Sequence, residues 1–162
     1  MRTLVKLARY TDWANQVVFG ACEEALPQVL QQTAPGTVGS IDDTLKHLVS
    51  VEDAYLAMLQ GRDPGEALGP RNEYFAHDLA WFAQHSRQLD AAYLALLDGK
   101  DEPWLEGPLR VPWFDHPMTR RDGLLQVFTH SAQHRAQVLS ELGAHGVKVP
   151  DVDYMLLLEV EE

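Results

Sequence analysis

The chain contains four long stretches in which apolar residues recur at helical spacing, and each is bounded by proline or glycine. This periodicity indicates amphipathic helices, because residues at that spacing line one face of an α-helix. We predict helices over residues 2–26, 40–60 and 73–98, and a fourth from residue 119 to a glycine at 143 or 146. Such helices bury their apolar faces against one another, so the pattern predicts an all-α protein built as a four-helix bundle.

Local signals at the helix ends support these bounds. Ser40 is a good N-cap, and Asp43 stands three residues later in place of the usual glutamate of a capping box. Thr119 can cap the last helix, where Asp122 in the first turn favours the helix dipole. Pro27 is expected to stop the first helix, because proline lacks the N–H that a helix interior needs.

Proline and glycine also mark the connections. Residues 32–39 are predicted to form a loop. Residues 100–118 hold four of the nine prolines, and we expect this density to exclude a helix there, with residues 109–114 at most extended. A connection of roughly twenty residues between the third and fourth helices predicts a crossover or a function. The segment 147–162 is apolar enough to pack but too short for another full bundle helix.

Charge excludes some classes of partner. The formal net charge is −11, and the only adjacent basic pair is Arg120 and Arg121. We therefore expect no binding to nucleic acid or to anionic membranes. Cys22 is the single cysteine, and the sequence shows neither a signal peptide nor an apolar run long enough to span a membrane. These features predict a cytoplasmic protein with one domain over residues 1–162.

His130 and His134 are four residues apart on the last predicted helix, which stacks them on one face. Both fall on the shoulder of the apolar stripe, where a side chain is held by the core and still reached from a cleft. The spacing leaves two interpretations open. The pair either shares a metal ion or consists of two half-exposed histidines with no joint role.

His47 falls on the shoulder of the second predicted helix, beside Val51 and Met58. In a helix bundle, ligands on facing helices converge on one point, and three imidazoles with an open position form a recurring catalytic metal site. The periodicity does not show that the second and fourth helices face each other. A core-edge histidine bonded to a neighbour is therefore the alternative for His47.

Two glutamates are the candidates for a fourth ligand. Glu52 falls near the apolar side of the second helix, and Glu141 follows His134 on nearly the same face. For Glu52 we favour a structural role with a bonded partner. The remaining histidines are predicted to be surface residues; they are His77, His85, His116 and His145.

Three segments resemble the DinB/YfiT-like metalloprotein family. They are residues 45–52 (LKHLVSVE), residues 130–137 (HSAQHRAQ) and the opening helix with Tyr10, Trp13, Ala14 and Asn15. The resemblance extends over essentially the whole chain, and its most specific part is residues 130–137. Ala136 stands where glycine is usual in the family, a departure that leaves the histidines unchanged.

The resemblance implies a four-helix bundle with a long crossover between the third and fourth helices, usually as a homodimer. It implies one divalent ion, zinc or nickel, held by His47, His130 and His134. Some members of this family transfer or isomerise with a low-molecular-weight thiol, and many others have no known reaction.

Three functional hypotheses stay open at this point. The first is a metal-dependent enzyme acting on a small molecule, a thiol transferase or a hydrolase, since a bound cation lowers the pKa of a bound thiol or water. The second is a non-enzymatic metal-binding stress-response protein, and the third is a helical interaction module with incidental histidines. Trp104, Trp113 and Phe114 either form the rim of a substrate site or pin the crossover to the bundle.

Overall fold

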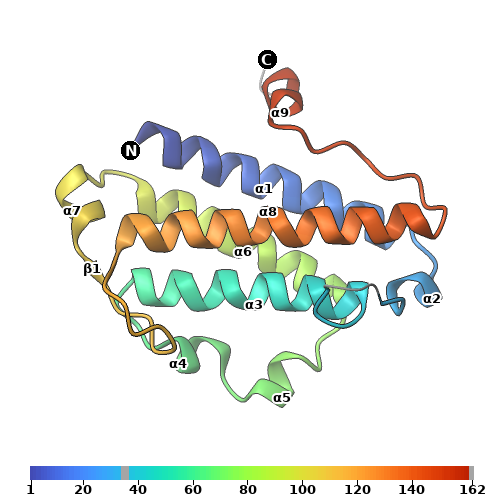
Figure 1. Cartoon of the computed structure of the whole chain (residues 1–162), viewed down its shortest axis with the longest axis horizontal. Coiled ribbons are helices and arrows are strands. Elements are labelled where there is room, and N and C mark those ends of the chain that lie inside the picture. Colours follow the sequence, from blue (N-terminus) through green and yellow to red (C-terminus); the bar gives the residue numbers. More distant parts are fainter. Residues whose placement is uncertain (34–36, 161–162) are drawn as a thin grey trace.

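Four long helices make up the body of the protein in the computed structural model, which describes residues 1–33 and 37–160. They are α1 (Arg2–Glu23), α3 (Ile41–Leu59), α6 (Leu79–Leu97) and α8 (Arg120–Ala144). Helices α1 and α3 each pack against both α6 and α8, so the four surround a shared core (Figure 1). The prediction of an all-α protein is confirmed, since the described residues contain only a small two-stranded sheet besides helices.

Shorter elements lie at the ends and along the sides of these helices. The short helices are α2 (Pro27–Leu30), α4 (Pro64–Leu68), α5 (Arg71–Tyr74), α7 (Glu102–Glu106) and α9 (Tyr154–Val160). Strands β1 (Pro108–Leu109) and β2 (Met118–Thr119) pair antiparallel, with Pro108 opposite Thr119. Figure 1 shows α4 and α5 following α3 along its outer side, whereas α7 and β1 lie at one end of the long helices.

The first predicted helix is too long. Helix α1 ends at Glu23 rather than at residue 26, and Pro27 begins α2 instead of ending α1. Proline suits the first turn of a helix, because its missing N–H has no intrahelical acceptor there. In the loop predicted at residues 32–39, Thr33 forms an isolated antiparallel bridge with Ser40, which directly follows the loop. Residues 34–36 lie outside the described part of the chain.

The third predicted helix begins too early. Residues 71–74 form α5, and α6 starts only at Leu79. Asp78 determines that start as the N-cap of α6. Its backbone is extended, and its side chain accepts a hydrogen bond from the Trp81 N–H (2.9 Å). The other end agrees with the prediction, since α6 ends at Leu97 and Gly99 takes a positive φ of 67°.

The expectation that prolines exclude a helix from residues 100–118 is wrong. Helix α7 lies within that segment and has Pro103 in its first turn. Asp101 caps it by accepting from the Trp104 N–H (2.9 Å). The predicted extended segment at 109–114 is also shorter than expected, because only Leu109 belongs to a strand. Proline density therefore limited helix length in this connection without preventing a helix.

Both predicted capping residues act as N-caps. At α3 the Asp43 N–H donates to Ser40 Oγ (3.1 Å), and the Ser40 N–H donates to the Asp43 carboxylate (2.9 Å). At α8 the same reciprocal pair joins Thr119 to Asp122, at 3.2 and 2.8 Å. These two boxes set the starts of the two helices that carry the candidate site.

A buried hydrogen-bond network links the four long helices at one level. Asn15 of α1 accepts from Arg135 of α8 (2.7 Å) and donates to Glu52 of α3 (3.1 Å). Ser131 of α8 donates to the same Glu52 carboxylate (2.7 Å), and Asp90 of α6 lies 3.4 Å from the Asn15 amide. All five residues are buried, so a change in the register of any one helix would leave polar groups without partners.

The segment after α8 packs as predicted without adding a long helix. It returns along α1, where the Tyr10 hydroxyl donates to the Val152 carbonyl (2.8 Å), and ends in the short helix α9. In the described part of the chain, no helix combines the length and the apolar character needed to cross a membrane.

Loss of the α8 cap should destabilise the protein. We expect Thr119→Ala to lower the free energy of unfolding by about 1 kcal/mol, because the Asp122 N–H in the first turn of α8 loses its acceptor, the Thr119 hydroxyl. Thr129→Ala is the matched control, since Thr129 is an exposed threonine within the same helix that bonds only to preceding carbonyls. Urea denaturation measures both variants. Equal effects of the two substitutions would contradict the capping role.

Candidate metal centre

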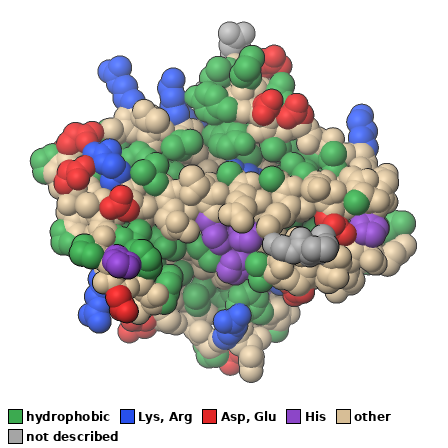
Figure 2. Space-filling view, viewed as in Figure 1, with side chains coloured by type: hydrophobic (Ala, Val, Ile, Leu, Met, Phe, Trp, Pro, Cys, Tyr) green, Lys and Arg blue, Asp and Glu red, His purple; other side chains and the backbone are tan. Residues whose placement is uncertain are grey.

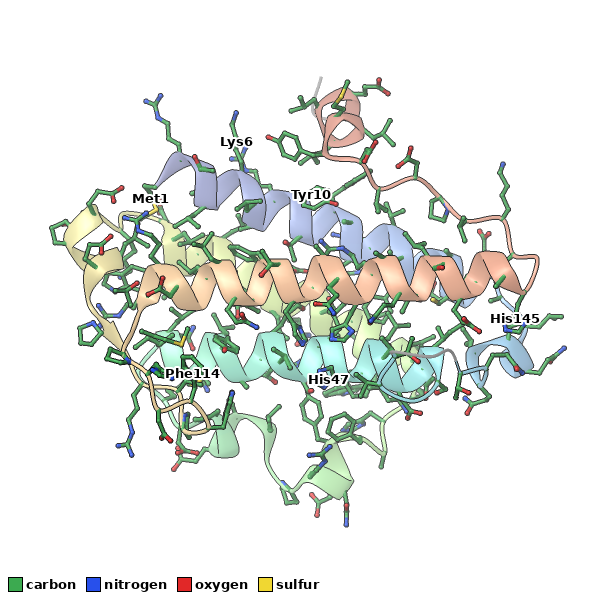
Figure 3. All side chains as sticks on the ribbon, in the orientation of Figure 1. Met1, Lys6, Tyr10, His47, Phe114 and His145 are labelled. Atoms are coloured by element: carbon green, nitrogen blue, oxygen red, sulfur yellow. The ribbon has the colours of Figure 1, made fainter. Side chains whose placement is uncertain are left out.

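Three histidines converge between α3 and α8. His47 comes from α3, and His130 and His134 come from α8. The Nε2 atom of His130 lies 3.2 Å from Nε2 of His47 and 3.1 Å from Nε2 of His134. Figure 2 shows a group of histidine side chains at the centre of one face, and Figure 3 labels His47 where α3 runs alongside α8. The structure thus brings together the three residues that the sequence analysis selected.

Helix packing produces this convergence. His130 and His134 stack because they are one turn apart on α8. Helix α3 packs extensively against α8, which answers the question that periodicity left open. On α8, Ser131 directly follows His130, and on α3, Glu52 follows His47. The hydrogen bond between Ser131 and Glu52 therefore favours the helix register in which His47 lies opposite the other two histidines.

The donor atoms fit a divalent ion. Two nitrogen ligands 2.0–2.1 Å from a tetrahedral ion are about 3.3 Å apart, close to the separations between these Nε2 atoms. Nδ1 of His134 lies 2.7 Å from Oε1 of Gln137. An amide oxygen only accepts, so Nδ1 carries the proton and Nε2 keeps a lone pair for a metal. Nδ1 of His130 is buried with no hydrogen-bond partner among the described residues.

Electrostatics keep two of these histidines neutral. Burial lowers the pKa of His130 to about 4, with smaller contributions from His134 and His47. Burial also lowers the pKa of His47, followed by the charges of His134 and Arg71. Neutral imidazole is the form that binds metals, so the site is prepared for a cation at neutral pH.

Neither candidate glutamate joins the histidines. Glu52 is buried and bonded to Ser131 and Asn15, which supports the structural role that we favoured. Its burial raises its pKa, an effect that those hydrogen bonds and Arg135 oppose. Glu141 instead pairs with His145 (2.9 Å). Within the described residues, the cluster that could hold a metal ion here consists of the three histidines alone.

One of the predicted surface histidines is not a simple surface residue. His85 Nε2 lies 2.8 Å from the buried Asp53 carboxylate, and the ring stacks on Trp81. Tyr74 donates to the same carboxylate at 3.4 Å. Because Asp53 lies on α3, no local pattern around His85 could have revealed this pair. The other three, His77, His116 and His145, are exposed as predicted.

A pocket of about 300 Å³ opens beside His47. Its floor is a face of α3, its side is formed by residues 65–75, and Trp113 lies at its edge. For Trp104, Trp113 and Phe114 the sequence left two roles open, the rim of a substrate site or the attachment of the crossover to the bundle, and only Trp113 lines this pocket. Trp104 packs under the Arg120 guanidinium instead, and Phe114 contacts His116.

Comparison with known protein families identifies the family of the chain. The sequence model of the DinB family matches residues 1–162, the whole chain. No curated protein matches the sequence. The match agrees with the resemblance carried by residues 45–52 and 130–137, which contain all three histidines of the cluster.

The low pKa of His130 should make the metal-free protein lose stability on acidification. Histidine in the unfolded chain protonates near pH 6.5, whereas folded His130 stays neutral to about pH 4. Between these values the unfolded state binds more protons, so stability falls as pH falls. Urea midpoints of chelator-treated protein from pH 7.5 to 4.5 should decrease less for His130→Gln than for the wild type. The exposed control His116→Gln should follow the wild type, and three parallel curves would contradict a buried neutral His130.

Proposed function

The chain belongs to the DinB family, and from this membership and its histidine cluster we propose a metal-dependent enzyme whose divalent ion is held by His47, His130 and His134. The observation that carries the proposal is the convergence of three Nε2 atoms from two helices. Nitrogen ligands favour zinc or nickel, although the supply of metal in the cell also decides occupancy.

The residues around the cluster support chemistry on a small molecule. A divalent ion held by neutral imidazoles lowers the pKa of a thiol or water that binds to it. Gln137 orients His134 through Nδ1, so that its other nitrogen faces the cluster. His47 also lines the neighbouring pocket, so a substrate bound in that pocket would lie against the cluster.

The reaction that we propose is transfer of a low-molecular-weight thiol, with hydrolysis of an ester or amide as the second candidate. In thiol transfer, the sulfur forms a bond to carbon while a carbon–halogen or epoxide carbon–oxygen bond breaks, and the thiol proton is released or passes to the opened oxygen. The three cluster residues include no carboxylate, so a coordination position is left for an incoming thiol or water, which both candidate reactions need. A homodimer and a cytoplasmic location stay predictions, as does the absence of nucleic-acid and membrane partners.

Purified protein should contain close to one divalent ion per chain. We expect His134→Ala to lose the ion during dialysis, because two imidazoles bind far more weakly than three. His145→Ala is the matched control, since His145 is exposed and paired with Glu141 at the end of the same helix. Elemental analysis of protein purified without an affinity tag makes the measurement. Full occupancy in His134→Ala would show that the ion is bound elsewhere.

Metal-loaded protein should form thioether conjugates from a bacterial low-molecular-weight thiol and an alkyl halide or epoxide. Mass spectrometry of the reaction mixture detects the conjugate. The His47→Ala variant should lose this activity, whereas the surface variant His77→Ala should keep it, because His77 is exposed and stacked on Trp81 away from the cluster. No turnover with any thiol, ester or amide would favour a metal-binding protein without enzymatic activity.

A further inference from the structure

The pocket beside His47 combines an apolar wall with a single charged residue. Four of its residues, His47, Ser50, Val51 and Ala54, follow one face of α3. Opposite them, Leu68 and other residues of the α4–α5 segment contribute mainly carbon atoms. A volume of about 300 Å³ is at the lower end of the range for small-molecule sites. The space therefore suits the apolar part of a small ligand.

The polar atoms of the wall already have partners. Ser50 Oγ donates to the carbonyl of His47 (2.8 Å), and the Tyr74 hydroxyl donates to Asp53 (3.4 Å). The imidazole of His47 belongs to the histidine cluster. A ligand in the pocket thus finds few free hydrogen-bonding groups on these side chains.

Arg71 is the exception. Of the described residues that line the pocket, it is the only Lys, Arg, Asp or Glu. Its guanidinium lies over the Phe75 ring at 5.3 Å, which holds it at the pocket edge. Among residues 1–33 and 37–160, no carboxylate forms an ion pair with Arg71. Although the net charge of the chain is −11, Arg71 is thus an exposed cation beside an apolar pocket, and it can bind an anionic ligand.

We infer that this pocket binds a small-molecule carboxylate with an apolar body, whose carboxylate is held by Arg71 and whose body packs between α3 and the α4–α5 segment. The planar guanidinium matches a carboxylate with two parallel hydrogen bonds, and one cation balances one negative charge. The inference rests on the proposed function in one respect, because it names the class of substrate placed against the histidine cluster.

Binding of 3-phenylpropionate and of its neutral amide tests the inference by calorimetry at low ionic strength. The first titrations use chelator-treated protein, so that a metal ion cannot itself attract the carboxylate. We expect the carboxylate to bind about fivefold more tightly than the amide, the effect of one partly exposed charge pair. Arg71→Gln should reduce this ratio to about one, and the exposed control Arg87→Gln should leave it unchanged.

A second variant tests the apolar part of the site. Val51→Phe places a larger side chain in the pocket and should weaken both ligands, because Val51 is half-buried and lines the wall. Equal affinities for carboxylate and amide in the wild type, an unchanged ratio in Arg71→Gln, or no effect of Val51→Phe would each overturn the inference. Elemental analysis of the same preparations separates the two proposals. Preference for the carboxylate in protein that never binds metal would refute only the proposed function, and metal binding without the preference would refute only this inference.

Discussion

The hydrogen bond from Ser131 to the buried Glu52 carboxylate determines how α3 and α8 lie against each other. Ser131 follows His130 directly, and Glu52 lies just beyond His47 on α3, so the register of this bond is also the register of the histidines. A slip of one turn would separate the histidines and deprive the buried Glu52 carboxylate of its donor on α8. The cost of such an unpaired group is what makes the register specific.

The same bond is part of a network that includes both remaining long helices. Asn15 of α1 joins Glu52 to Arg135, and Asp90 of α6 lies within reach of the same amide. Burial raises the pKa of Glu52 and of Asp90, and hydrogen bonds from Asn15 oppose both shifts. The role that we assign to this buried polar network is to align the four long helices. The chemistry that we propose takes place on the outer side of α3.

Helix α3 serves both helix alignment and the candidate site, and it does so with different faces. One face carries Glu52 toward the network, and another carries His47 toward the cluster and the pocket. A third contact, from Asp53 to Tyr74 and His85, attaches α5 and α6 to the same helix. Because Tyr74 ends α5, this attachment also fixes the segment that begins with Arg71. The edge of the pocket thus depends on a buried carboxylate that never lines it.

Local spacing predicted what depends on neighbours along the chain, and tertiary packing decided the rest. The capping residues Ser40 and Thr119 and the pairing of His130 with His134 follow from the geometry of one helix turn, so the sequence alone determined them. The early start predicted for the third helix failed because Asp78 caps it locally. Other features bring together residues far apart in sequence. They are the position of His47 opposite the pair, the bond from Ser131 to Glu52, the bond between Asp53 and His85, and the position of Arg71 beside the pocket. Their positions depend on how the helices pack and on which buried polar groups find partners. Helical periodicity in the sequence specifies neither the packing nor the pairing.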